Sequence, residues 1–247
     1  MRLVLIAGLL ALGLACDHPH IATTELPRAA SPSAPEPLEC VEAISAGALG
    51  EEPLPLLVAL HGLGSTPERF AEIFTGLEFP ARILSIRAPI DEGEGRAWFV
   101  FRHGGERAVA DLEALVPRAM RTIRRFEAER PTLGRPVLLG FSQGGMVAYE
   151  LALAEPAHFA AVFPVSAVKL GSVPSSIPEG VPPIRAFHGS DDPIIPLSAH
   201  EEDIVAFRRA GADATLTRVS GAPHWITAPM REQLFGELRS FLSPPTE

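Results

Sequence analysis

The hexapeptide GFSQGG, residues 140–145, follows the apolar run PVLL and leads directly into the helix-forming stretch MVAYELALA. A strand that turns at once into a helix forces its corner residue into a strained backbone conformation, and glycines are needed beside it because a Cβ would collide there. The form G-x-S-x-G in this setting is the signature of a nucleophile elbow, which lifts the serine hydroxyl above the end of a sheet. The sequence therefore predicts that Ser142 is a nucleophile.

Short apolar runs alternate with longer stretches of helical periodicity from LLVAL, residues 56–60, onward. The runs LLVAL, RILSI, PVLLGF, AAVFPVSA and IRAFHG are too short for core helices and read as buried strands of a parallel sheet. Helices are expected over residues 67–74, 109–129, 143–154, 197–210 and 230–242. This alternation predicts an α/β fold with a doubly wound, mostly parallel sheet, helices on both faces, and a ligand site beyond the carboxyl ends of the strands.

A serine hydroxyl is a poor nucleophile at neutral pH, so it needs a base, and the base needs an orienting carboxylate. In α/β-hydrolases these residues follow in the order Ser, Asp or Glu, His. The segment FHGSDDPIIP ends a predicted strand and supplies Asp191 and Asp192, and GAPHWI supplies His224 before the last helix. We therefore predict His224 as the base and one of the two aspartates as its partner.

The loop LHGLGS follows the early strand run LLVA and has the position of an oxyanion-binding loop. One donor should come from this loop and one from the residue after the nucleophile, so the backbone amides of Leu63 and Gln143 are the expected pair. His61 lacks the H-x-x-E-H or paired-cysteine spacing of a metal site. We expect it to hold the loop, and the sequence implies no metal.

Five segments, LHGLGS, RAPIDEGEGRAWF, GFSQGGMVA, HGSDDPIIPL and GAPHWI, resemble in their order the phospholipase/carboxylesterase family of α/β-hydrolases, which includes the acyl-protein thioesterases. The resemblance implies a serine hydrolase of carboxylic esters or thioesters without metal or organic cofactor. It implies that Asp192, directly before a proline, is the triad acid. It also implies that Trp98 and Phe99 lie beside the substrate, and Trp225, next to His224, is a third candidate for that pocket.

The first sixteen residues, MRLVLIAGLLALGLAC, contain one arginine and then an uncharged apolar run too short to span a membrane, which predicts a signal peptide over residues 1–15. The end of this run, GLAC, resembles a bacterial lipoprotein processing site, in which Cys16 would be acylated. Ordinary cleavage is the alternative, and it would leave Cys16 able to pair with Cys40 in an oxidising compartment. Either reading predicts an exported protein that is periplasmic, membrane-anchored or secreted.

Residues 16–37 are rich in Pro, Ala and Ser and lack an apolar period, so we expect a flexible linker followed by a hydrolase domain over residues 38–247. The cytosolic thioesterases of the family lack such a leader and linker, which disfavours a protein-deacylating role for this chain.

A net charge of −9 argues against nucleic-acid binding. We expect a small-molecule ester as substrate, and membrane contact only through an N-terminal lipid. A short-peptide serine peptidase and a non-catalytic binding lipoprotein with a hydrolase fold remain alternatives.

Overall fold

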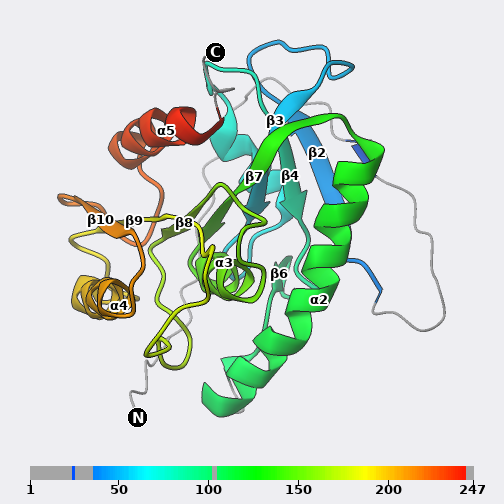
Figure 1. Ribbon diagram of the computed structural model, residues 1–247. Helices are drawn as coiled ribbons and strands as arrows, with labels where there is room; N and C mark the ends of the chain where they lie inside the picture. Colours follow the sequence, from blue (N-terminus) through cyan, green and yellow to red (C-terminus); the bar gives the residue numbers. More distant parts are fainter. Residues whose placement is uncertain (1–23, 26–35, 102–104, 243–247) are drawn as a thin grey trace.

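A central sheet of eight strands, in the order β1-β2-β4-β3-β7-β8-β9-β10, organises the computed structural model, which describes residues 24–25, 36–101 and 105–242 (Figure 1). The six strands from β4 to β10 in this order are parallel, whereas β1 and β2 join the β4 edge antiparallel. The predicted α/β-hydrolase fold class is confirmed. The strands are β1 (Thr24–Glu25), β2 (Cys40–Ile44), β3 (Leu54–Leu60), β4 (Arg82–Ile86), β7 (Thr132–Phe141), β8 (Ala161–Val165), β9 (Ile184–Gly189) and β10 (Ala214–Val219).

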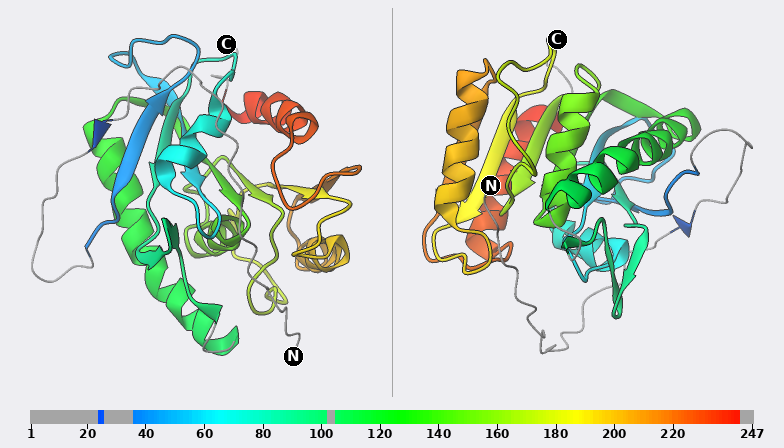
Figure 2. Two further views of the ribbon diagram at one scale, coloured as in Figure 1. Left: turned by 180° about the vertical axis from the view of Figure 1, so that it is seen from behind. Right: turned by 90° about the horizontal axis from the view of Figure 1, so that it is seen from below.

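Helices cover both faces of the sheet, and Figure 2 shows the two layers from behind and from below. Successive side chains of a strand point to opposite faces. Leu56 and Val58 of β3 therefore belong to the core cluster that also contains residues of α2, α3 and α4, while Leu57 and Ala59 belong to the cluster that contains residues of α1 and α5. The helices are α1 (Pro67–Ala71), which continues into the 3₁₀ turn η1 (Glu72–Phe74), α2 (Gly105–Glu129), α3 (Gln143–Ala154), α4 (Leu197–Arg209) and α5 (Ala228–Leu242).

The predicted helices are all present, and α2 begins four residues earlier than expected, at Gly105. The structure also contains features that the sequence analysis did not predict. The strand β2 was not expected because it is short and owes its strand character to pairing with β4. A hairpin of β5 (Ile90–Glu92) and β6 (Gly95–Ala97) occupies the segment after β4.

The predicted linker contributes the two residues of β1, which pair with β2. The rest of it up to residue 35, the predicted signal peptide and Cys16 lie outside the described residues. Cys40 is a buried free thiol at the start of β2. Among the helices of the described ranges, none combines the length and apolar character needed to cross a membrane.

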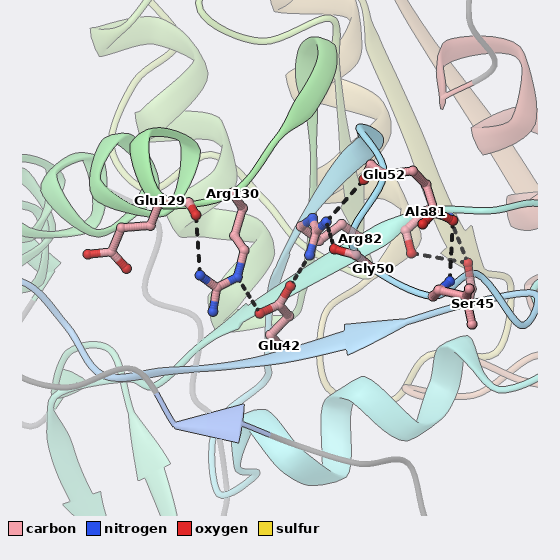
Figure 3. A network of polar contacts seen from close by, with 9 residues as sticks. Glu42, Ser45, Gly50, Glu52, Ala81, Arg82, Glu129 and Arg130 are labelled. Carbon is pink, nitrogen blue, oxygen red and sulfur yellow. Dashed lines mark hydrogen bonds and ion pairs between the residues drawn. The ribbon is translucent and has the colours of Figure 1, made fainter.

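A buried ionic network fastens the β2 edge to the parallel part of the sheet (Figure 3). Arg82, the first residue of β4, is 1% exposed and pairs with Glu42 of β2. The second carboxylate oxygen of Glu42 accepts a hydrogen bond from Nε of Arg130 at 2.9 Å. Nearby, the hydroxyl of Ser45 accepts from the amide of Ala81 at 2.9 Å. Because Arg82 begins its strand, this network lies at the end of the sheet opposite the predicted site.

Candidate active site

Ser142 occupies the sharp turn between β7 and α3, with a φ of 53° and a ψ of −118°. A positive φ is strained for a residue that has a Cβ, and such strain is found where surrounding structure imposes it. The neighbouring glycines allow the turn to close. A Cβ on Gly140 would lie 2.1 Å from the carbonyl oxygen of Gly144, and a Cβ on Gly144 would lie 2.1 Å from that of Leu60. The sharp turn from strand to helix that the sequence predicts at Ser142 is therefore present.

The structure brings Ser142, His224 and Asp192 into one line of hydrogen bonds. The Nε2 atom of His224 lies 2.9 Å from the hydroxyl oxygen of Ser142, and Nδ1 lies 2.7 Å from Oδ2 of Asp192. The loops that carry the histidine and the aspartate meet at Gly189, where a Cβ would lie 2.1 Å from the carbonyl oxygen of Ala222. A serine, a base and a carboxylate in this geometry can carry out nucleophilic acyl transfer.

Asp192 is held as a carboxylate by four donors. Its Oδ1 accepts from the amides of Ile194 and Ile195, both at 2.9 Å. Its Oδ2 accepts from His224 and, at 3.2 Å, from Nε2 of His188. Burial alone would raise the pKa of Asp192, but the hydrogen bonds from His188, His224 and Ile195 outweigh it and hold this pKa well below its usual range. The sequence analysis missed His188, because a histidine inside an apolar strand run gives no distinct signal.

The loop of residues 61–65 runs beside the elbow, because a Cβ on Gly62 would lie 3.5 Å from the Cβ of Ser142. Within the described part of the chain, the amides of Leu63 and Gln143 donate no hydrogen bond to another residue. Gln143 is buried, and a buried amide normally finds a partner, whereas Leu63 lies at the exposed edge of the loop. Both amides are therefore free to donate to an oxygen bound beside Ser142.

His61 holds this loop from below and is fully buried. Its Nδ1 donates to the carbonyl oxygen of Gly62 at 2.8 Å, and its Nε2 accepts from the amide of Ala88 at 3.2 Å. Burial lowers the pKa of His61 to about 4, which keeps the ring neutral. Both ring nitrogens are used inside the protein, as expected for a histidine that supports the loop.

Two of the three predicted pocket aromatics support the site rather than line it. Trp98 and Phe99 are each 1% exposed, so neither ring offers an open surface to a substrate. The indole Nε1 of Trp98 donates to the carbonyl oxygen of His61 at 2.7 Å. The side-chain amide of Gln143 accepts from the amide of Trp98 and donates to the carbonyl oxygen of Phe99, both at 3.1 Å. These bonds tie the loop to the first turn of α3. The sequence pattern could not distinguish aromatic residues that pack in this way from aromatic residues that line a substrate pocket.

Trp225 has the opposite placement from the other two aromatics. It is 62% exposed and packs edge-on against Phe141, with the ring centroids 6.1 Å apart. Leu63 is also exposed, at 42%. Trp225 follows His224 in the sequence and Leu63 follows Gly62, so both exposed apolar side chains lie at the edge of the site. No group of three or more His, Cys, Asp or Glu side chains in the described ranges is arranged to hold a metal ion.

A family model described as phospholipase/carboxylesterase matches residues 42–242. The chain belongs to the phospholipase/carboxylesterase family. Membership confirms the predicted family and makes the chain a hydrolase of an esterase family, for which small-molecule esters are the implied substrates.

Individual relatives of this phospholipase/carboxylesterase chain are distant. Esterase YpfH of Escherichia coli (strain K12) is 29% identical over 178 residues, which cover 69% of this chain and 76% of YpfH. The crystal structure of esterase PE8 matches with a TM-score of 0.67 and 24% identity over 81% of this chain and 99% of PE8. Arabidopsis thaliana SOBER1 matches with a TM-score of 0.61 and 20% identity over 76% of this chain and 99% of its own. At these identities the two solved structures support the fold alone.

Proposed function

We propose that this protein hydrolyses carboxylic esters through a Ser142–His224–Asp192 triad and an acyl-enzyme intermediate. The observation that carries the proposal is the position of His224, whose two ring nitrogens reach the serine hydroxyl at 2.9 Å and the Asp192 carboxylate at 2.7 Å. His224 takes the proton of Ser142 as the hydroxyl oxygen attacks the ester carbonyl, and later gives it to the leaving alcohol. Asp192 holds the imidazole with its proton on Nδ1.

The negative charge that develops on the carbonyl oxygen needs donors in place before the reaction. The unused amides of Leu63 and Gln143 suit this role, and the bonds of Trp98 to His61 and to Gln143 hold the two donor-bearing segments together. Water then attacks the acyl-enzyme with His224 as the base, and the acid is released.

Ester substrates with an apolar part fit the exposed side chains of Leu63 and Trp225. A panel of p-nitrophenyl esters, acyl-thioesters and peptide anilides measures the preference directly. We expect turnover of esters, with thioesters as the second substrate class. Faster cleavage of the anilides would instead identify a peptidase.

The decisive experiment is labelling with a fluorophosphonate probe. The wild-type protein should be labelled at Ser142, as mapped by peptide mass spectrometry, and Ser142→Ala should lose labelling and about 10⁶-fold in kcat. Ser240→Ala removes an exposed serine on α5, outside the loops that carry the triad, and serves as the matched control. A folded wild-type protein that neither reacts with the probe nor turns over esters would be a binding protein with a hydrolase fold.

We also propose that the chain is exported and carries a lipid on Cys16. The apolar leader and the motif GLAC support export, and the Pro-rich linker that follows would let an anchored domain clear the membrane surface.

A further inference from the structure

A second histidine approaches Asp192 from the protein interior. His188 in β9 has its Nε2 atom 3.2 Å from Oδ2 of Asp192 and 2.9 Å from the carbonyl oxygen of Ile195. Its Nδ1 lies 2.8 Å from Nδ1 of His200 in α4, and Nε2 of His200 lies 2.7 Å from the hydroxyl of Tyr149 in α3. The two histidines are 0% exposed and the tyrosine is 1% exposed. We call Tyr149, His200 and His188 the buried chain.

The fold brings the buried chain together from three elements. Ile184, Ala186 and His188 share one face of β9 because side chains alternate along a strand. That face packs under α3 and α4, which lie on the same side of the sheet (Figure 1). Helix α3 begins immediately after Ser142, so the buried chain links the helix of the nucleophile to the loop of the acid.

The position of each proton in the buried chain follows from its partners. The hydroxyl of Tyr149 has His200 as its hydrogen-bond partner among the described residues, so this buried O–H donates to Nε2 of His200. A neutral His200 then carries its proton on Nδ1 and donates it to Nδ1 of His188. His188 in turn carries its proton on Nε2, where both neighbours are acceptor oxygens. In this arrangement each hydroxyl and ring nitrogen of the buried chain has a partner, and every hydrogen bond is donated in the direction of Asp192.

Burial favours this neutral arrangement. It raises the pKa of Tyr149 well above the usual range, so the phenol keeps its proton. Burial, followed by the neighbouring His188, lowers the pKa of His200 well below its usual range, so this ring stays neutral. In the reversed arrangement, His200 would carry its proton on Nε2 and His188 would carry its proton on Nδ1. The O–H of Tyr149 would then lose its acceptor, and the unprotonated Nε2 of His188 would face the carboxylate of Asp192.

We propose that the buried chain fixes His188 as an Nε2–H donor and thereby positions Asp192 for His224. The proposal rests on the proposed function, in which Asp192 orients the base. Tyr149, His200 and His188 touch no reacting atom and are positioning residues: they hold one oxygen of the carboxylate in place while the imidazole of His224 gains and loses a proton. A network of this kind inside a protein acts as a unit, so its far end should influence kcat.

Nitrogen-15 NMR of histidine-labelled protein tests the proton positions without any substrate. We expect His188 to carry a proton on Nε2 and not on Nδ1, and His200 to carry one on Nδ1. A protonated Nδ1 on His188 overturns the proposal. This measurement does not depend on turnover, so it can stand even if Ser142→Ala shows that the proposed ester hydrolysis is wrong.

Tyr149→Phe tests whether the far end of the chain matters for the reaction. The substitution keeps the ring that stacks on Phe207, at a centroid distance of 5.1 Å, and removes one hydroxyl. We expect kcat to fall about tenfold with KM little changed, which is the lower end of the effect that loss of an outer hydrogen-bond partner has at metal-binding side chains. We also expect the NMR signals of His188 and His200 to show mixed tautomers. Unchanged kcat and unchanged tautomers would overturn the proposal.

Thr122→Val is the matched control. It removes a buried hydroxyl that bonds to Leu38 at 2.7 Å, far from the site along α2, and should lower stability while leaving kcat and the tautomers unchanged. His188→Leu and His188→Gln complete the set. Leucine removes the donor to Asp192, whereas glutamine offers an N–H in its place, so kcat should fall with leucine and recover in part with glutamine. Equal kcat values for these two folded variants would contradict a role through hydrogen bonding.

Discussion

The imidazole Nδ1 of His224 lies 2.7 Å from the carboxylate of Asp192, while Asp191, the preceding residue, is exposed and accepts a hydrogen bond from Ser190. Adjacent carboxylates thus have different surroundings. Asp192→Asn should lower kcat by about 10⁴-fold because the amide favours the wrong imidazole tautomer. Asp191→Asn should change kcat little. Steady-state kinetics of the two folded variants measures both, and equal losses would contradict the assignment of the acid.

Gly144 tests the packing of the elbow. A Cβ there would lie 2.1 Å from the carbonyl oxygen of Leu60, which is backbone and cannot move aside cheaply. Gly144→Ala should therefore lower the free energy of unfolding by about 3 kcal/mol or more. Gly236→Ala is the control, because that glycine is exposed on α5 with open space around it and alanine should add about 0.5–1 kcal/mol of helix stability. Urea denaturation compares the two variants, and similar midpoints would contradict the prediction.

His61 predicts a pH dependence of stability. Its pKa is lowered from 6.5 to about 4 in the folded protein, so between these values the unfolded chain binds a proton that the folded chain does not. The free energy of unfolding should consequently fall as the pH drops from 6.5 to 4, by about 3 kcal/mol from this residue.

Denaturation curves of wild type and His61→Gln across this pH range isolate that contribution. The buried His200, whose pKa is also lowered, adds a slope of the same sign in both proteins. The variant should therefore show a shallower pH dependence than the wild type. Parallel curves for the two proteins would show that His61 is not the source.

The buried pair of Arg82 and Glu42 predicts a large asymmetry between single and double substitutions. Glu42→Gln leaves a 1% exposed guanidinium without its carboxylate and should cost about 3–5 kcal/mol of unfolding free energy. The double variant Glu42→Leu with Arg82→Met should recover most of this loss, because both fully buried charges are removed together. Arg130 also loses its bond to Glu42, but its side chain is 27% exposed and can be solvated. Arg107→Ala, which breaks an exposed ion pair with Asp111, should cost about 0.5 kcal/mol or less. A double variant less stable than Glu42→Gln would contradict the argument.

Cys16 decides where the protein resides. If this residue is acylated, the protein expressed in a bacterium should fractionate with membranes, and Cys16→Ser should release it or block its processing. Mass spectrometry of the mature N-terminus checks the modification. A disulfide between an unmodified Cys16 and Cys40 would contradict lipidation. Its formation would require Cys16 to reach the buried thiol of Cys40 at the start of β2.

Local pattern was enough to predict the fold class and the elbow. The elbow is built from contiguous residues: the run PVLL, the glycines around Ser142 and the helix that follows. Its local structure can therefore be predicted from the sequence alone. The order of Ser142, Asp192 and His224 could be predicted for a similar reason: the first two lie in short motifs at the ends of predicted strands, and the third lies in a short motif before the last helix. The strand β2 was missed because its partner β4 lies about forty residues further along the chain. The β5–β6 hairpin was missed because each of its strands has only three residues, too few to show a strand pattern.

Contacts between distant segments required the tertiary structure. The family resemblance placed Trp98 and Phe99 beside a substrate, yet both rings are enclosed in the structure. The sequence could not show this, because aromatic residues of the core and of a pocket occur in the same kinds of sequence pattern. The buried chain of Tyr149, His200 and His188 was invisible for a related reason. Its members stand on α3, α4 and β9, and only the packing of these elements brings their polar atoms within hydrogen-bonding distance of one another and of Asp192. A motif records which residues the chemistry needs, whereas long-range packing decides which other residues hold them in place.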